Sequence, residues 1–312
     1  MKILRPIKIT DSHLVSCSIP ENDYPAWSAA TTYARGAFVI SPTTHTVYRS
    51  LQDGNLNHNP DLEQLALADP LIDDPDPVQW QIISATNRWR LFDGKPSVRA
   101  TDEDEIVVEL APAVAIAGVA GFEISAAKVR VTMTNAGEVV YEREIAMQDE
   151  TVIGDWYSYY FEPITELSEF VLVDLPPYAN AVVKVEALRP GGDVSVGQIV
   201  LGPVWAIGST AVKGTGFQGV DFSYVEQDEF GDLTTVRRAA TRLSTFEVWV
   251  DNAQLLGLDA RLRGLRGGTA AVWVGDTDAR KAAMNYGFYR GYRSAYQTDG
   301  HSLMQIEVQG IV

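Results

Sequence analysis

The chain has 312 residues, of which 46% are hydrophobic and 21% charged, so it can build packed cores and is not generally disordered. Its formal net charge of −16 argues against binding to nucleic acid, because phosphate backbones are bound through cationic side chains. A chain of this length folds as about two or three domains. Residues 85–205 carry 19 acidic but only nine basic residues, which indicates a solvated acidic surface and a separate middle domain.

Cysteine content and apolar runs bear on the compartment. Cys17 is the only cysteine, which excludes an intrachain disulfide and a thiolate metal cluster. The N-terminal residues lack a continuous apolar stretch, so we expect no secretory signal. The longest apolar run, residues 110–122, contains a proline and is too short to span a bilayer. We therefore expect a protein that folds in a reducing cytoplasm and does not insert into a membrane.

The first compact unit is expected at residues 24–84, after a lead-in segment at residues 1–23 that alternates poorly between apolar and polar side chains. Four short β-rich pieces follow one another in this unit: residues 31–33, 37–40, 46–51 and 78–82. The stretches between the last two pieces are rich in Asp, Asn and Pro, which predicts loops. Because a few short strands bury little surface area, the unit should be only marginally stable by itself.

The middle part, residues 85–207, has the pattern of strand after strand. Residues 128–134 place alternate apolar side chains on one face, and residues 139–145 return after a turn, which predicts a hairpin. Further strands are expected at residues 170–173, 181–187 and 198–205. Many short strands at such spacing favour a β-sandwich of the jelly-roll or galactose-binding-like type.

The last part, residues 208–312, is expected to be β-rich with one packed helix near residues 252–266. Asp251 and Asn252 offer an N-cap, and leucines recur at helical spacing from Leu255 to Leu265. Strands are expected on both sides of this helix, at residues 244–250, 270–274, 286–292 and 303–308. The sequence therefore predicts a mainly β fold: a small module, a sandwich, and a β-rich C-terminal domain.

Motifs for catalysis or cofactor binding are weak. Gly214, Gly216 and Gly219 match the glycine spacing of dinucleotide-binding loops, but the following residues alternate like a strand instead of opening a helix. We interpret this motif as a glycine-rich turn. The four histidines, His13, His45, His58 and His301, show no metal-binding spacing, and no nucleophile motif is present. We expect no catalytic residue, no metal, no cofactor and no enzymatic activity.

Two acidic clusters, Asp102–Glu105 and Asp73–Asp76, could hold a glycosidase carboxylate pair or a calcium ion. Their spacing fits no calcium-binding loop of the EF-hand kind, and acidic surface turns are commoner. We therefore expect solvated turns at both places.

The densest aromatic stretch is residues 155–162. In a strand, Trp156 and Tyr160 would share one face, and Tyr157 and Tyr159 the other. One face should belong to the core, whereas the other could cover a subunit interface or stack on a sugar ring. These four residues are our candidates for interface or glycan contact.

The segment from Trp27 to Trp80 resembles the chitin-binding-like modules of the small type 5/12 carbohydrate-binding family. The shared pattern is met by Trp27, Thr31, Tyr33, Gly36, Val39, Tyr48 and Trp80. In glycan-binding members a Trp-rich pair follows the strand that contains Tyr48, but here Gln52-Asp53-Gly54 stands in that place. We therefore expect the four aromatic residues of the motif to form the core of the module instead of a sugar platform: Trp27, Tyr33, Tyr48 and Trp80.

Nearly the whole chain is similar to a family of tailed-bacteriophage tail proteins. The segments that carry this resemblance are residues 87–94, 155–164, 175–179, 221–239, 271–276, 286–292 and 301–312. The resemblance implies a structural subunit of the tail tip or baseplate, located in the virion after assembly in the bacterial cytoplasm. It also implies that the partners are other copies of the chain and other tail proteins.

Two other functions are compatible with the sequence. The chain could be a receptor-binding lectin that recognises host cell-surface polysaccharide through the module or the face of Trp156 and Tyr160. A depolymerase would need two carboxylates about 5–10 Å apart in a groove, and the sequence names no such pair. The structural subunit, which could also contribute to contact with the host surface, is the function that we expect.

Overall fold

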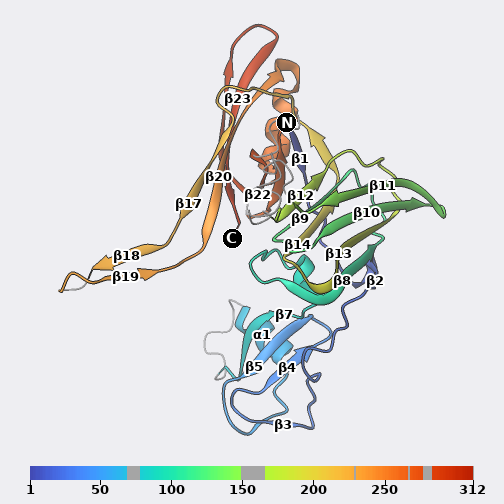
Figure 1. The fold of residues 1–312 in the computed structure, drawn as a ribbon, viewed down its shortest axis with the longest axis vertical. Helices are drawn as coiled ribbons and strands as arrows, with labels where there is room; N and C mark the ends of the chain where they lie inside the picture. Colours follow the sequence, from blue (N-terminus) through green and yellow to red (C-terminus); the bar gives the residue numbers. More distant parts are fainter. Residues whose placement is uncertain (69–77, 149–165, 228–229, 266–267, 277–282, 312) are drawn as a thin grey trace, which may run out of the picture.

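The computed structural model describes residues 1–68, 78–148, 166–227, 230–265, 268–276 and 283–311. The fold is mainly β, as predicted, with the small module at one end and a long C-terminal sheet at the other (Figure 1). A β-sandwich lies between them, and a narrow arm of strands extends away from the C-terminal sheet (Figure 1).

The module is built from two small antiparallel sheets and one helix. Its elements are β3 (Thr32–Tyr33), β4 (Phe38–Ser41), β5 (Thr46–Ser50), β6 (Asn55–Leu56), α1 (Pro60–Ala68) and β7 (Trp80–Ala85). Strands β4, β5 and β7 form one sheet, and β3 pairs with β6. The prediction of loops throughout the polar stretch after β5 was wrong for Pro60–Ala68, which is helical. Asn59 caps this helix, because its Oδ1 accepts hydrogen bonds from the backbone N–H groups of Asp61 and Leu62.

The sandwich has a five-stranded antiparallel sheet as its outer layer. In spatial order its strands are β11 (Glu138–Ala146), β10 (Lys128–Asn135), β13 (Val182–Val196), β8 (Ala100–Leu110) and β2 (Leu14–Cys17). The predicted hairpin is confirmed as β10 and β11. Two expectations were wrong here. The acidic residues Asp102–Glu105 lie within strand β8, and residues 189–193, read as a break between strands, lie within β13 at a register shift.

The sandwich and the C-terminal sheet together are called the body of the molecule. A three-stranded sheet forms its central layer. Its strands are β12 (Glu169–Leu172), β9 (Gly118–Phe122) and β14 (Gln198–Gly202). Every residue of β9 and β14 is buried, because the five-stranded sheet covers one face and the C-terminal sheet covers the other. Burial on both faces explains why these strands read as continuous apolar runs instead of alternating. The sandwich and the C-terminal sheet are thus joined through a shared core.

The C-terminal sheet is antiparallel and has eight strands. Its strands are β15 (Val204–Ala206), β1 (Lys2–Leu4), β21 (Ala271–Val274), β22 (Asn285–Tyr296), β23 (His301–Gly310), β20 (Ala240–Asp251), β16 (Ser209–Thr210) and β17 (Gly216–Asp221). The 3-10 turn η4 (Asn252–Gln254) leads into α3 (Leu255–Arg263), whose Leu258 and Leu262 pack on this sheet. Asp251 accepts a hydrogen bond from the backbone N–H of Ala253, as its predicted capping role requires.

The N-terminal residues contribute a strand to the C-terminal sheet and another to the five-stranded sheet. Strand β1 lies between β15 and β21 in the C-terminal sheet, and the 3-10 turn η1 (Asp11–His13) leads into β2 at the edge of the sandwich. A second such turn, η2 (Trp89–Phe92), follows the module and contributes Trp89 and Leu91 to the sandwich core. The residues predicted as a lead-in segment therefore hold the body together before the chain enters the module.

Candidate functional sites on the module and the arm

The motif aromatics of the module form its core. Tyr33, Tyr48 and Trp80 are buried, and Trp27 packs against them. The rings of Tyr33 and Trp80 meet edge to face, with centroids 5.3 Å apart and an interplanar angle of 70°. Trp80 also donates from its Nε1 to the carbonyl oxygen of His58 at 2.9 Å. Rings enclosed in this way present no free face to a sugar.

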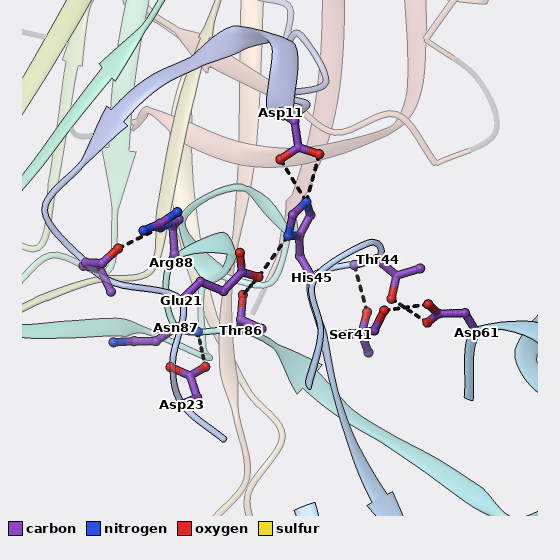
Figure 2. Close-up of polar contacts among 12 residues, drawn as sticks. Asp11, Glu21, Asp23, Ser41, Thr44, His45, Asp61, Thr86, Asn87 and Arg88 are labelled. Carbon is purple, nitrogen blue, oxygen red and sulfur yellow. Dashed lines mark hydrogen bonds and ion pairs between the residues drawn. The ribbon is translucent and has the colours of Figure 1, made fainter. Parts of the chain in front are cut away.

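A carboxylate ties helix α1 to the sheet of the module. Asp61 accepts hydrogen bonds from Ser41 Oγ at 2.5 Å, Thr44 Oγ1 at 2.8 Å and Tyr48 OH at 2.9 Å. Figure 2 shows the contacts of Ser41 and Thr44 with this carboxylate. Burial raises the pKa of Tyr48, so its hydroxyl keeps its proton and acts as the donor. Three hydroxyl donors to one carboxylate make Asp61 a polar anchor of the helix.

We expect Asp61→Asn to destabilise the module by about 1.5–3 kcal/mol, because an amide loses the charge and one of its acceptor oxygens. Hydrogen exchange measures the effect: peptides from β4 and β5 should exchange faster in the variant than in the unmodified chain. Leu62→Ala is the matched control, because Leu62 is exposed on the next position of the helix and should change stability by less than about 0.5 kcal/mol. Equal exchange in the two variants would contradict the role given to Asp61.

An exposed aromatic pair on the module was missed by the sequence analysis. The rings of Tyr24 and Phe38 stack with centroids 5.0 Å apart and an interplanar angle of 19°, and both are exposed. Phe38 lies in register with Arg49 and Gln81, which are also exposed. No motif in the sequence marks this pair, since Tyr24 and Phe38 are brought together only by the fold.

The other candidates for glycan or interface contact lie outside the described residues: Trp156, Tyr157, Tyr159 and Tyr160. The same holds for the acidic cluster at residues 73–76.

The glycine motif lies at the start of β17, before the chain leaves the C-terminal sheet. Gly214 has a φ of +86°, and a Cβ there would lie 2.1 Å from the side chain of Glu247. The next residue, Thr215, accepts a hydrogen bond at its Oγ1 from the backbone N–H of Glu247. Strand β17 follows, not a helix, as expected. Gly214 therefore serves a close turn against β20, whereas Gly216 and Gly219 lie in β17, and the motif provides no helix N-terminus for a phosphate.

The arm is defined here as residues 221–227 and 230–240, where the chain leaves the C-terminal sheet as a two-stranded ribbon (Figure 1). Its strands are β18 (Tyr224–Gln227) and β19 (Leu233–Val236). Tyr224 pairs with Val236 on one face of the ribbon, while Val225 and Leu233 lie on the other. The exposed fractions are 43% for Tyr224, 59% for Val225, 68% for Leu233 and 91% for Phe230 near the tip. Both faces of the ribbon are thus partly apolar and open to solvent.

The root of the arm is fixed firmly to the body. Arg242 donates to Glu169 at 2.8 Å and to the carbonyl oxygen of Met284 at 2.9 Å, and its guanidinium lies over the ring of Phe217. Asn285, which is buried, donates to the carbonyl oxygen of Arg242 at 2.9 Å. These contacts set the direction in which the arm leaves the sheet.

Within the described ranges, no group of three or more His, Cys, Asp or Glu side chains is arranged to hold a metal ion. No helix in the same part of the chain is long and apolar enough to cross a membrane.

Comparison with models of protein families, with curated proteins and with solved structures found no match to this chain. The geometry of the arm and of the module therefore carries the functional argument, together with the resemblance in sequence.

Proposed function

We propose that this chain is a structural subunit of a bacteriophage tail tip or baseplate, which assembles as an oligomer at the distal end of the tail. The observation that carries the assembly part of this proposal is the arm. The phage setting rests on the similarity of the chain to tailed-phage tail proteins, which extends over segments from residue 87 to residue 312.

The arm has the physical properties of an assembly element. A two-stranded ribbon is at best marginally stable in water, because it has no layer against which to bury its side chains. Tyr224 lies on one face and Val225 and Leu233 on the other, so a single covering surface would leave part of the apolar area exposed. A ribbon of this kind is stabilised when neighbouring subunits enclose it.

A second copy of the chain is the partner that we propose for the arm. The chain carries a net charge of −16, and this charge hinders the approach of two copies. The arm with its tip, residues 221–240, has two basic and five acidic residues, so its own charge does not relieve this repulsion. Its exposed apolar side chains must offset the repulsion, and they make the arm the surface that we propose for contact between copies.

Two measurements test the proposed function. Light scattering after size-exclusion chromatography should show an oligomer of the purified chain, and mass spectrometry should find the chain in virions of the phage that encodes it. A monomer at all concentrations, together with absence from virions, would overturn the proposal.

A further inference from the structure

The turn that joins β4 to β5 meets the body through one side chain. His45 lies in this turn, and its Nδ1 is 2.9 Å from Glu21 Oε1. Its Nε2 is 3.1 Å from both carboxylate oxygens of Asp11. The ring also stacks on Trp89, with centroids 4.0 Å apart and an interplanar angle of 16°. Figure 2 shows His45 reaching from the module into the space between the two acidic residues.

The four residues come from separate parts of the chain. Asp11 lies in η1, directly before the edge strand of the sandwich, and Glu21 lies in the connection that enters the module. Trp89 begins η2 and belongs to the core of the sandwich. We call His45, Asp11, Glu21 and Trp89 the clip, because together they connect the module to the body.

The geometry of the clip suits two N–H donors on the imidazole ring, because a carboxylate lies at hydrogen-bond distance from each ring nitrogen. Ionised carboxylates only accept hydrogen bonds, and a neutral imidazole has one donor and one acceptor nitrogen. The protonated ring donates to Glu21 and Asp11 at the same time, and its positive charge is attracted to both. In the neutral ring, one nitrogen lone pair would face a carboxylate oxygen, so one hydrogen bond and both ion pairs would be lost.

Neighbouring groups also help to hold the His45 ring between Glu21 and Asp11, the arrangement that we call the closed form of the clip. Thr86 donates from its Oγ1 to the same Glu21 oxygen at 2.9 Å, and from its backbone N–H to the carbonyl oxygen of His45 at 2.8 Å. The side chains of His45 and Glu21 are only 15% and 14% exposed. His45 also has a φ of +54°, a conformation that non-glycine residues adopt rarely and that here directs the ring towards the body.

The other charged groups near the clip have partners of their own. Arg88 donates to the carbonyl oxygen of Ile19, and Arg90 donates to that of Ala85 and to Ser84 Oγ. Asp23 accepts from the backbone N–H of Asn87. His13 on η1 contacts Thr10 Oγ1. Asp11 and Glu21 are therefore the ionisable groups in contact with the His45 ring.

We propose that the clip is a pH-responsive fastening that holds the module in one orientation when His45 is protonated and lets its orientation vary when His45 is neutral. A group that is charged in the closed form stabilises that form at low pH, and the contribution is lost as pH rises and the ring loses its proton. Histidine loses its proton between about pH 5 and pH 8, a range in which Asp and Glu stay ionised. The orientation of the module is thus coupled to the acidity of the medium, whichever function the chain has.

Distance measurements between spin labels test the clip in the full chain. Labels on Gln52→Cys in the module and Glu138→Cys on the sandwich hairpin, both exposed positions, are introduced in a Cys17→Ser background. At about pH 5.5 we expect one narrow distance distribution, and at about pH 8.5 a broad one, with at least about a tenfold rise in the displaced population. A distribution that is the same at both pH values would overturn the proposal.

Three variants identify the group responsible. His45→Asn keeps a side chain that tolerates positive φ and should give the broad distribution at both pH values. Asp11→Asn lies at an exposed carboxylate, so it leaves folding intact and should shift the transition to lower pH. His301→Asn, in an exposed position of the C-terminal sheet, is the control and should behave as the unmodified chain. A pH response that survives in His45→Asn would assign it to another group and refute the clip.

Discussion

The combined substitution of Tyr224→Ser, Val225→Ser and Leu233→Ser is expected to dissociate the oligomer into folded monomers. Each apolar side chain contributes about 1.5 kcal/mol when an interface buries it, so the loss of three amounts to about 4.5 kcal/mol. This corresponds to about a 2,000-fold weaker self-association. Sedimentation velocity over a range of concentrations measures the shift, and far-UV circular dichroism checks that the fold is retained.

A control with equal apolar loss separates the arm from a general effect on solubility. Leu62→Ser, Leu65→Ser and Val139→Ser remove three residues that are exposed on the module helix and the sandwich hairpin. We expect this variant to keep the oligomer. If both variants dissociate equally, or if neither does, the arm is not the element that joins the copies.

The second large effect is expected from Trp80→Ala, which should unfold the module and leave the body folded. Trp80 is 1% exposed, and its removal costs about 3–5 kcal/mol of packing together with the hydrogen bond to the carbonyl oxygen of His58. A unit of this size has little stability to lose. The sandwich and the C-terminal sheet are built around other core clusters, and Trp80 is not part of these.

Hydrogen exchange resolved by peptide distinguishes the two parts. In the Trp80→Ala variant, we expect peptides of residues 32–50 to exchange as an unfolded chain, while peptides of β8 and β23 stay protected. Ile82→Ala is the control, because Ile82 lies on the same strand with 48% of its surface exposed and should have a small effect. Loss of protection throughout the chain would show that the module and the body fold as one cooperative unit.

Local patterns in the sequence were sufficient for some elements. Helix α3 follows from its leucine spacing and from Asp251, which caps the turn η4 that leads into it. The hairpin of β10 and β11 follows from its alternation and turn. In contrast, α1 was misread because Asn59 and Pro60 were taken as loop residues. They are equally typical of an N-cap and a first helical position, and both serve those roles here.

Features that depend on contacts between distant parts of the chain could not be predicted from local sequence patterns. The pairing of β1 with β21 joins residues about as far apart as the chain allows, and nothing local in residues 2–4 indicates it. The residues of the arm were read as strand-like, but nothing local in them indicates that the strands leave the sheet and stay exposed. The spacing of His45 indicated only that it is not a metal ligand, because its carboxylate partners Asp11 and Glu21 are brought to it by the fold.

The site residues also divide into those that a local motif indicates and those that only the fold brings together. The burial of Tyr33, Tyr48 and Trp80 agrees with the expectation drawn from the missing Trp-rich pair, since each ring is enclosed by the module itself. The exposed pair of Tyr24 and Phe38 has no counterpart in that pattern. A motif thus indicated which aromatic residues build the module, but not which ones lie on its surface.

The central claim, that the arm joins one copy of the chain to another, is tested most directly by photo-cross-linking. A benzophenone amino acid replaces Phe222, which is exposed at the start of the arm, in an equal mixture of ¹⁴N- and ¹⁵N-labelled chains. We predict cross-linked peptide pairs that combine the two isotopes, with the arm of one chain attached to another copy. Cross-links that form only within chains of a single isotope, or none at all, would contradict the claim.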